Sequence, residues 1–574
     1  MPAAARVPCS ARPRECLDSG VMSDSTCRIV PLGGLGEVGK NMTAYECGDS
    51  ILVVDAGLSF PRDEHLGVDL VLPDFGWLAD RRDRIRAVAL THGHEDHVGA
   101  LPYLLREVGA PEVWATRLTL GMIKSKLDEH GLLRSTELRE AEPGAAPVQL
   151  GPFRLEFVRV AHSIPDAVAI AIDTPAGLVL HTGDYKMDHT PVDGQKTDVG
   201  RLAELGTRGV DLLLGDSTNA ERPGVTQSER VVGEAFRQII PQRQGRILIS
   251  SFASNVHRMQ QAIDVAVEVG RKVCVIGRSM RKNLNIARNL EYVRVPDGVL
   301  IKPNDLDEYR PHEVLVLCTG SQGEPMSAMT RIAYGDHPAI QVERGDTVII
   351  SAKPIPGNEL RVHDSINRLA KLGAEVLHEE NSNVHVSGHG NAEELRTMLS
   401  LVRPRAVMPV HGEFRMLAAH AQLARDAGVP ADSIVLAENG TVVELSRSGV
   451  RVVGQVEAGM TFVDGLGVGD VRDVALRDRR RLSEDGVLII VATLASRNGG
   501  FATAPPELIA RGFGDAEELL DDLRGEAARV LEDCLAGGVS EIKLLQEHLH
   551  DGVGQVVYDR TRRRPMILPV VIEV

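Results

Sequence analysis

The segment 92–97 reads His-Gly-His-Glu-Asp-His, so three imidazoles and one aspartate carboxylate stand within six residues. A lone histidine is more often an ordinary surface or core residue. Crowding four such groups without a cation would cost desolvation free energy and leave polar atoms unpaired. Imidazole nitrogen and carboxylate oxygen suit Zn²⁺, with Mn²⁺ less favoured. The sequence therefore predicts a metal site built from His92, His94, Asp96 and His97.

Four ligands in one loop cannot complete two metal shells, so we expect further ligands downstream. Three candidates each follow a short apolar stretch that predicts a strand: His162, Asp184 and His411. Polar groups at strand ends, on loops held by a rigid sheet, are how α/β folds build sites. Asp55 also follows a strand, and its alternative role is that of a turn former using its own Asx hydrogen bond.

The spacing of apolar residues predicts the elements that position these side chains. Short strands are expected at 27–31, 51–54, 85–90, 153–160, 167–172, 178–180 and 210–214, with an amphipathic helix at 98–108. From 226 to 377 the pattern changes to repeated strand-then-helix units, which indicates a parallel sheet with its own core. Polar clusters of the first kind resume at His385, so we interpret 226–377 as an insertion. The last hundred residues predict a small α+β domain.

Composition narrows the class of protein. At 574 residues, several domains are expected, and 25% charged with 43% hydrophobic residues is typical of a globular chain. The net charge of −16 speaks against a nucleic-acid partner, although one basic groove can bind RNA on an otherwise acidic surface. Seven scattered cysteines without a C-x-x-C pair favour a reducing compartment, and no apolar stretch is long enough for a membrane span. We therefore expect a cytoplasmic protein. Residues 1–26 are expected to be a disordered leader, with Met22 as an alternative start.

Several motifs together point to a known family. The metal loop, with Asp55-Ala56-Gly57 before it and Thr182-Gly183-Asp184 after it, resembles the metallo-β-lactamase superfamily. The stretch 215–219 (GDSTN) resembles motif A of the β-CASP nucleic-acid hydrolases, 387–389 (SGH) motif B, and 409–413 (PVHGE) motif C. Further matches are 252–256, 319–328 and 356–359. Over nearly everything after residue 27, the chain resembles the bacterial ribonuclease J family.

That resemblance implies a fold. A metallo-β-lactamase αββα sandwich would carry an inserted β-CASP α/β domain and a small C-terminal α+β domain. The expected boundaries are a first metallo-β-lactamase part at 27–225, the β-CASP domain at 226–377, a second metallo-β-lactamase part at 378–450, a linker at 451–470 and the C-terminal domain at 471–574.

The resemblance also implies roles for the candidate residues. It implies two Zn²⁺ per subunit, with Mn²⁺ or Mg²⁺ as alternatives, one held by His92, His94, His162 and Asp184, the other by Asp96, His97, Asp184 and His411. The metals would activate water for attack on phosphorus. Asp96, Asp216 and His389 are expected to be catalytic, with His389 stabilising the transition state or protonating the leaving 3′ oxygen. Asp216 and Asp55 would orient ligand side chains.

Candidate RNA contacts follow from the same motifs. The resemblance places His385, Ser387 and Gly388 around a nucleotide phosphate, which suits a histidine donor and backbone N–H groups. Ser254, Asn255 and Arg258 are further candidates for contacts to single-stranded RNA, and such contacts favour binding that tolerates any sequence. A solvated basic helix face is the equal alternative for a single arginine such as Arg258.

The family implies 5′→3′ exoribonuclease activity that favours 5′-monophosphate ends, plus endonuclease cleavage, in RNA maturation and decay. It also implies a homodimer or homotetramer formed through the C-terminal domain, and RNA-decay partners. Two other classes stay open. A hydrolase of a small thioester or lactam would not need the insert at 226–377. A non-enzymatic RNA-binding subunit would be expected to lose ligands, whereas this chain keeps the full set.

Overall fold

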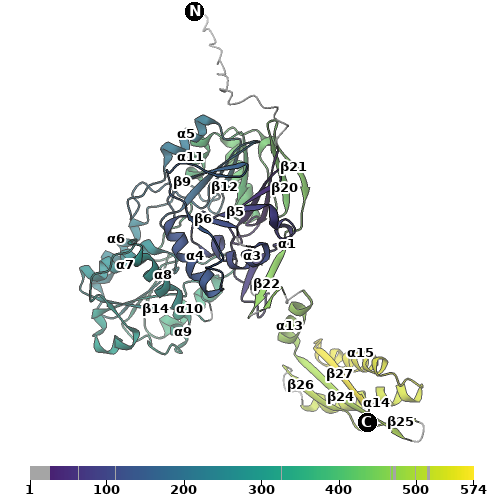
Figure 1. Cartoon of the computed structure of the whole chain (residues 1–574). Helices are drawn as coiled ribbons and strands as arrows, with labels where there is room; N and C mark the ends of the chain where they lie inside the picture. The colour runs from purple at the N-terminus through teal and green to yellow at the C-terminus, as the bar shows by residue number, and fades with distance from the viewer. Residues whose placement is uncertain are drawn as a thin grey trace, which may run out of the picture. The chain divides into compact units, whose positions relative to one another are not determined.

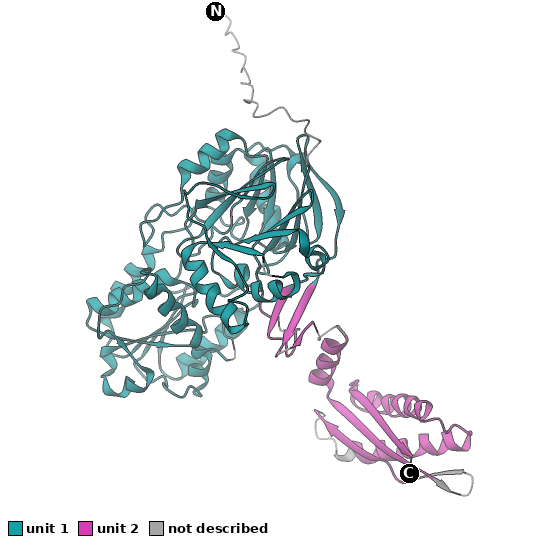
Figure 2. Cartoon of the chain, viewed as in Figure 1, with its two compact units in different colours: residues 1–58, 73–459 teal, residues 59–72, 460–574 magenta. Residues whose placement is uncertain are grey.

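The computed structural model describes residues 26–573 except 63, 110, 325, 466, 470–472, 498–499 and 513–516. The expected leader, apart from residue 26, and Met22 lie outside the described residues. The chain forms two compact units, one made of 1–58 and 73–459, the other of 59–72 and 460–574 (Figure 2). Within the described residues, no helix has both the length and the apolar character that crossing a membrane requires.

Two sheets of the first unit share one core. The eight-stranded sheet runs in the order β21-β20-β1-β2-β3-β5-β6-β7, and the six-stranded sheet in the order β19-β12-β11-β10-β9-β8. One cluster of buried residues takes members from both sheets, among them Ile29, Leu52, Phe157 and Leu212. The strands are β1 (Cys27–Gly33), β2 (Met42–Cys47), β3 (Ser50–Val54), β5 (Ile85–Ala89), β6 (Glu112–Ala115), β7 (Leu138–Glu140), β8 (Val148–Leu150), β9 (Phe153–Arg159), β10 (Val168–Thr174), β11 (Gly177–His181), β12 (Leu212–Asp216), β19 (Ala406–Val410), β20 (Thr441–Ser446) and β21 (Gly449–Gln455).

Helices lie outside this pair of sheets. On the outer face of the six-stranded sheet, Leu180 and Leu213 belong to the same buried cluster as Leu202 and Leu399 from the covering helices. Those helices are α5 (Val199–Arg208), α11 (Ala392–Val402) and α12 (Phe414–Asp426). Helices α2 (Glu95–Val98), α3 (Leu101–Val108) and α4 (Arg117–Glu129) follow β5 and β6, and most of α3 is buried. The layers are those of an αββα sandwich (Figure 1).

Late segments of the chain complete both sheets. β20 pairs antiparallel with β1, and β19 pairs parallel with β12, so that Val410 lies opposite Asp216. Between β12 and β19 the chain builds a third sheet, all parallel, in the order β15-β14-β16-β13-β17-β18. Its strands are β13 (Ile247–Ser250), β14 (Lys272–Ile276), β15 (Leu300–Ile301), β16 (Val314–Cys318), β17 (Thr347–Ile350) and β18 (Glu375–Leu377).

Helices cover both faces of this third sheet, which is why its strands are mostly apolar. On one face, Phe236, Met259 and Leu284 pack with strand residues in one buried cluster, and on the other Met329 and Leu369 do so. The helices are α6 (Arg230–Ile239), α7 (Val256–Glu268) and α8 (Arg278–Asn289) on the first face, and α9 (Ala328–Tyr334) and α10 (Glu359–Lys371) on the second.

The second unit combines a short early segment with the end of the chain. β4 (Leu70–Pro73) joins β22 (Met460–Asp464) and β23 (Gly467–Val468) in a three-stranded sheet. Most of the expected linker at 451–470 is strand, because it contains the end of β21 as well as β22 and β23. The Gly-rich sequence carries no local pattern that would have predicted the pairing of β4 with β22. A second sheet contains β24 (Val487–Arg497), β25 (Gly500–Thr503), β26 (Glu507–Arg511) and β27 (Met566–Glu573), with helices α13 (Asp473–Asp485), α14 (Glu517–Ala536) and α15 (Ile542–Thr561).

Candidate metal centre

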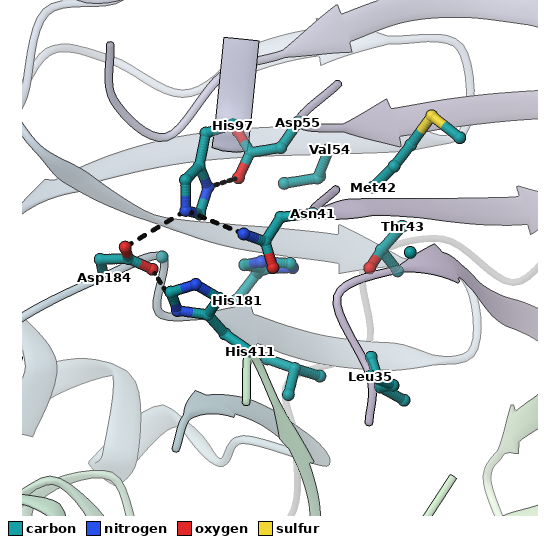
Figure 3. Close-up of a pocket in the computed structure, with 13 residues that line it drawn as sticks. Leu35, Asn41, Met42, Thr43, Val54, Asp55, His97, His181, Asp184 and His411 are labelled. Atoms are coloured by element: carbon teal, nitrogen blue, oxygen red, sulfur yellow. Dashed lines mark hydrogen bonds and ion pairs between the residues drawn. The ribbon is translucent and has the colours of Figure 1, made fainter. Parts of the chain in front are cut away.

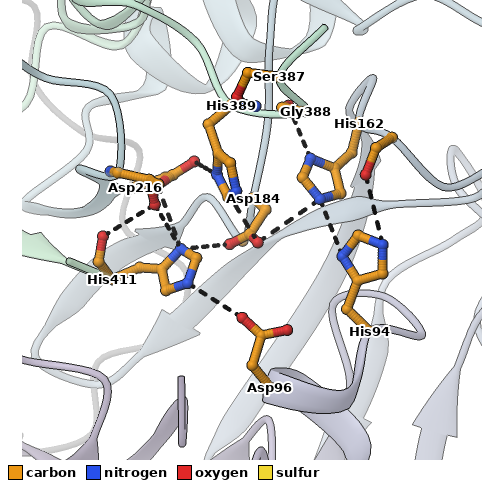
Figure 4. Close-up of polar contacts among 12 residues, drawn as sticks. His94, Asp96, His162, Asp184, Asp216, Ser387, Gly388, His389 and His411 are labelled. Atoms are coloured by element: carbon orange, nitrogen blue, oxygen red, sulfur yellow. Dashed lines mark hydrogen bonds and ion pairs between the residues drawn. The ribbon is translucent and has the colours of Figure 1, made fainter. Parts of the chain in front are cut away.

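The first donor group consists of His92, His94, His162 and Asp184. The two residues of the metal loop follow β5, whereas His162 follows β9 and Asp184 follows β11, so three strand ends meet here (Figure 4). His94 Nδ1 lies 3.0 Å from His92 Nε2 and 3.2 Å from His162 Nε2. Asp184 Oδ2 lies 3.6 Å and 3.7 Å from the same two Nε2 atoms. The sequence-predicted set is thus brought together in space.

The second donor group consists of Asp96, His97, Asp184 and His411. His97 Nε2 lies 3.2 Å from Asp184 Oδ2 and 3.7 Å from Asp96 Oδ2. His411 Nε2 lies 3.4 Å from Asp96 Oδ2, and His411 Nδ1 lies 3.0 Å from Asp184 Oδ1 (Figure 3 and Figure 4). Asp184 therefore belongs to both groups, one carboxylate oxygen facing the imidazoles of the metal loop and the other facing His411.

Fixed acceptors behind two imidazoles determine which ring nitrogen is free. Asp55 Oδ2 lies 2.7 Å from His97 Nδ1, and the carbonyl oxygen of Gly388 lies 2.8 Å from His162 Nδ1. Carboxylate and carbonyl oxygens only accept, so Nδ1 donates in both cases and the neutral ring keeps a lone pair on Nε2. Both lone pairs face Asp184. This arrangement of imidazole, outer acceptor and free nitrogen is typical of metal-binding histidines.

The residues fit a divalent cation. Asp184 Oδ1 and His411 Nε2 are buried atoms without a hydrogen-bond partner in the described part of the chain. Buried polar atoms are normally paired, and two such atoms beside lone pairs of other acceptors would be costly without a positive charge between them. A donor set of imidazole nitrogen and carboxylate oxygen suits Zn²⁺ or Mn²⁺.

The histidines of the two donor groups differ in the direction in which their pKa values are shifted. Burial lowers the pKa of His162 well below its usual value and that of His94 to about 4. Burial also lowers the pKa of His97 and of His411, but the surrounding carboxylates, Asp184 foremost, together outweigh it and raise both pKa values well above the usual value. The unprotonated imidazole is the form that binds a metal. The carboxylates therefore make protons bind more tightly to His97 and His411, so protons compete with a metal ion more strongly in the second donor group.

Asp216 and His389 lie beside the donor groups. Asp216 ends β12, and its Oδ2 lies 2.8 Å from His389 Nδ1, while its Oδ1 lies 3.4 Å from His411 Nδ1. Thr218 donates to Asp216 Oδ1 through its backbone N–H and its hydroxyl, at 3.0 Å and 2.9 Å. Burial lowers the pKa of His389, but Asp216 and Asp184 outweigh it and raise the pKa above its usual value. The His389 side chain is 19% exposed, so it is reached from solvent.

The segment 385–389 places the expected phosphate contacts next to this centre. Its Gly388 carbonyl holds His162, as described above, and its Ser387 hydroxyl accepts from Asn219 Nδ2 at 2.9 Å. The neighbouring backbone N–H of His389 also points to the Ser387 hydroxyl, at 3.2 Å. Motif B is thus tied to the first donor group.

Arg258 requires a correction. The sequence makes it a candidate for RNA contact, but it is 1% exposed and therefore cannot reach RNA directly. Its Nε and Nη2 donate to Glu229 Oε1 at 2.8 Å and 2.6 Å, and its Nη1 donates to the Ser351 carbonyl at 2.6 Å. Nη1 also lies 3.1 Å from His385 Nδ1. Because arginine only donates, His385 accepts at Nδ1 and carries its proton on Nε2.

Asn255 is likewise used inside the fold. It is the N-cap of α7, and its side chain accepts from the backbone N–H of Arg258 at 3.0 Å. N-capping satisfies an otherwise orphan donor of the first helical turn. Ser254, one residue earlier, is half-buried and carries no such bond among the described residues.

Sequence reasoning missed several supporting residues. Asn41 Nδ2 lies 3.1 Å from His97 Nε2, and Thr91 donates to Asp55 from both its backbone N–H and its hydroxyl. Lys186 is buried, and its Nζ donates to the carbonyls of Ser387 and Gln227 at 3.2 Å each. Thr91 directly precedes the predicted ligand His92, and Lys186 lies two residues after Asp184, which is the one signal that could have found them.

Fold and site together define a metal-dependent hydrolase of the metallo-β-lactamase superfamily. The superfamily's model matches residues 35–187. The model described as "Ribonuclease J, beta-CASP domain" matches 244–369, "Zn-dependent metallo-hydrolase RNA specificity domain" matches 374–434, and "Ribonuclease J C-terminal domain" matches 474–574.

Proteins named ribonuclease J are similar to this chain over most of its length. The chain is 43% identical to ribonuclease J 1 of Streptococcus pyogenes, covering 95% of this chain and 97% of that protein. It is 43% identical to ribonuclease J of Mycobacterium tuberculosis, covering 97% and 99%, and 40% identical to ribonuclease J2 of Bacillus subtilis, covering 95% and 98%. This chain belongs to the ribonuclease J family, and it is a metal-dependent ribonuclease.

A solved structure agrees in fold. A protein of unknown function from Enterococcus faecalis superposes with a TM-score of 0.53 at 16% identity, covering 74% of this chain and all of that one. The predicted fold class, with its metallo-β-lactamase, β-CASP and C-terminal domains, is confirmed by the family models.

Proposed function

We propose that this protein uses two zinc ions per subunit to degrade single-stranded RNA in the 5′→3′ direction, favours 5′-monophosphate ends, and also cleaves RNA internally, in RNA maturation and decay. The observation that carries the proposal is the shared carboxylate of Asp184, which joins two donor groups, the first of them tied to the segment 385–389 through His162. An acidic chain needs such a local site to hold an RNA phosphate.

The residues of the centre have distinct tasks in this proposal. Bound metal ions supply a nucleophilic water at neutral pH and offset charge on the phosphate oxygens. Asp184 belongs to both donor groups, and Asp55 fixes the ring of His97. Asp216 holds His389 through Nδ1, so His389 Nε2 is left to donate a hydrogen bond or a proton to the leaving 3′ oxygen. Asp96, with its side chain 29% exposed, closes the second group on the solvent side.

Preference for a 5′-monophosphate is supported by the surroundings of His385. Burial lowers its pKa well below the usual value, and the nearby cations Arg258, Lys353, Lys186 and Arg222 lower the pKa further. Neutral His385 carries its proton on Nε2 and can donate a hydrogen bond from there, and it lies among positively charged side chains. Such a site suits a terminal phosphate, which has more acceptor oxygens than an internal one.

The test compares two RNAs that differ only at the 5′ end. With uniformly labelled single-stranded RNA, we expect mononucleotides from the 5′-monophosphate form and slow release from the 5′-hydroxyl form. His385→Ala should reduce the rate on the 5′-monophosphate RNA by about tenfold, since a hydrogen bond to a charged group contributes about 1.5–3 kcal/mol, and should leave internal cleavage unchanged. Equal rates on both RNAs, with internal fragments as the only products, would contradict 5′ recognition.

We also propose that the C-terminal sheet joins copies of the chain into a homodimer or homotetramer. Leu488, Ile490 and Val571 of this sheet are buried with α14 and α15. Apolar residues of its strands are nevertheless exposed, namely Ile509, Leu568, Val570 and Ile572. Exposed apolar residues on one sheet are typical of a self-association surface. Free, buried thiols at Cys27, Cys47, Cys274 and Cys318 support a cytoplasmic location.

A further inference from the structure

Exposed arginines gather at one end of the four-stranded sheet in the second unit. They come from three separate segments: the helix α13, the end of β26 and the connection from α15 to β27. The arginine cluster consists of Arg477, Arg480, Arg481, Arg511, Arg562, Arg563 and Arg564.

Strand pairing and one hydrogen bond bring these segments together. Val487 at the start of β24 pairs with Arg511 on one side and with Met566 on the other, so the last residue of β26 and the first of β27 lie at the same end of the sheet. Arg481 Nε donates to the carbonyl of Arg564 at 2.8 Å, which joins α13 to the segment before β27. Residues 477, 480 and 481 are three and four apart on α13, so they share one helix face.

The positive charge of the cluster is largely unmatched. Arg562 lies 3.9 Å from Asp559, and none of the other six arginines forms an ion pair with a residue that the structure describes. The guanidinium groups of Arg562 and Arg564 lie over the ring of Tyr558, at 5.4 Å and 4.7 Å from its centre. Stacking leaves the N–H groups at the rim of each guanidinium available to an acceptor.

This concentration of positive charge contrasts with the chain as a whole, whose net charge is −16. On the neighbouring helices of the same unit, arginines are paired with carboxylates: Arg524 with Asp521, Arg529 with Glu526, and Arg560 with Asp522. Crowded like charges repel, so seven arginines at one end of the sheet are most favourable when an anion binds there. The planar guanidinium matches phosphate oxygens in bidentate geometry.

We propose that the arginine cluster is a second RNA-binding surface, which holds the phosphate backbone of single-stranded RNA without reading its sequence. The inference rests on the proposed function only in taking RNA as the polyanion that a ribonuclease meets. Backbone binding of this kind needs clustered cations and no base contacts, and it weakens steeply with salt. The cluster would raise the affinity for long RNA while leaving chemistry to the metal centre.

The experiment removes three cluster charges and compares them with three removed elsewhere on the same unit. The test variant is Arg477→Gln, Arg480→Gln and Arg563→Gln together, since none of these side chains forms a hydrogen bond or ion pair within the described part of the chain. The control variant is Arg524→Gln, Arg529→Gln and Arg560→Gln. Both use the full chain loaded with zinc, and fluorescence anisotropy measures binding of a 2′-O-methyl RNA of about 30 nucleotides, which resists cleavage and exceeds the reach of a single binding site.

We expect the test variant to raise the Kd at about 0.1 M salt by roughly tenfold or more, and to reduce the slope of log K against log salt by about 2. The control variant should bind within about twofold of the original protein, and both should cleave an RNA too short to span the two surfaces at the original rate. Light scattering checks that the size of the assembly is unchanged.

Three results would overturn the proposal. These are unchanged RNA binding by the test variant, an equal loss of binding in the control variant, and binding of polyglutamate as tight as that of the RNA, which would assign the cluster to acidic proteins. Failure of the proposed function is distinguishable, because a protein that binds RNA through the cluster but cleaves no RNA would refute only the enzymatic proposal.

Discussion

At the metal centre, the acceptor atom behind two of the imidazoles decides which ring nitrogen faces the donor group. Asp55 performs this task for His97, and the Gly388 carbonyl performs it for His162. Asp55 is itself held by two bonds from Thr91 and adopts a positive φ of 62°. A left-handed backbone at a non-glycine residue is costly, so its presence beside the donors indicates that this placement matters.

The substitution Asp55→Asn tests this role. The amide side chain can still accept one hydrogen bond, but it no longer balances the charge of His97 or reliably selects its tautomer. Zinc affinity of the second donor group should therefore fall by about 10–100-fold, as is usual for the partner of a metal-binding histidine. Competition with a chromophoric chelator measures this. Asp49→Asn, at an exposed turn residue, is the matched control, and equal zinc affinity in both variants would refute the assignment.

His420 should make stability depend on pH. Burial lowers its pKa from 6.5 to about 4, while Ser217 Oγ lies 3.0 Å from its Nδ1. The unfolded chain binds this proton more readily than the folded chain does. The contribution of His420 to stability is therefore complete above pH 6.5 and is lost as pH falls toward 4, by about 1 kcal/mol for each pH unit.

The measurement compares denaturant unfolding of the original protein and of His420→Gln between neutral pH and the acidic end of this range. The variant is less stable at neutral pH because it loses packing, but the difference between the two proteins should shrink as the solution becomes acidic. A difference that stays constant over this range would show that His420 does not titrate on unfolding.

At the scale of elements, the 385–389 segment approaches the first donor group so closely that position 388 has no room for a side chain. A Cβ on Gly388 would lie 2.6 Å from His162 Cε1 and 2.9 Å from Ser163 Oγ. Gly388→Ala should therefore displace His162 and weaken zinc binding at the first donor group by about 10–100-fold, while the second group keeps its affinity. Zinc titration should then show one strong and one weak site.

Gly200→Ala in α5 is the control, because its nearest neighbour is an Asp198 oxygen at 3.5 Å. If Gly388→Ala still binds zinc equally well at both sites, the 385–389 segment shifts without displacing His162, and the prediction is wrong.

Local sequence signals predicted the centre better than its supports. His92, His162 and Asp184 each follow an apolar strand, so pattern and chemistry coincided there. The role of Arg258 could not be foreseen, because its partners Glu229 and Ser351 are 29 and 93 residues away and only the tertiary fold brings them together. The same holds for the pairing of β4 with β22, since short strands separated by hundreds of residues carry no pattern of their own.

At the scale of the whole molecule, self-association should depend on the exposed residues of the C-terminal sheet. Changing Leu568 and Val570 to Lys places charges on that surface and should convert the assembly into monomers, which light scattering measures. Lys substitutions at Val267 and Leu372, exposed in the first unit, are the control and should leave the size unchanged. Unchanged size in the test variant would refute this surface as the contact.

The central claim is that two metal ions at the Asp184 centre cleave RNA. The most direct measurement determines zinc per chain and the rate of digestion of 5′-monophosphorylated single-stranded RNA, for the original protein and for Asp96→Ala. We predict two zinc ions per chain in the original protein. For Asp96→Ala we predict a lower zinc content and a rate reduced by more than the roughly 10–100-fold that outer partners contribute. Zinc-loaded protein that binds this RNA but leaves it uncut, or an Asp96→Ala variant that digests it at the original rate, would contradict the account.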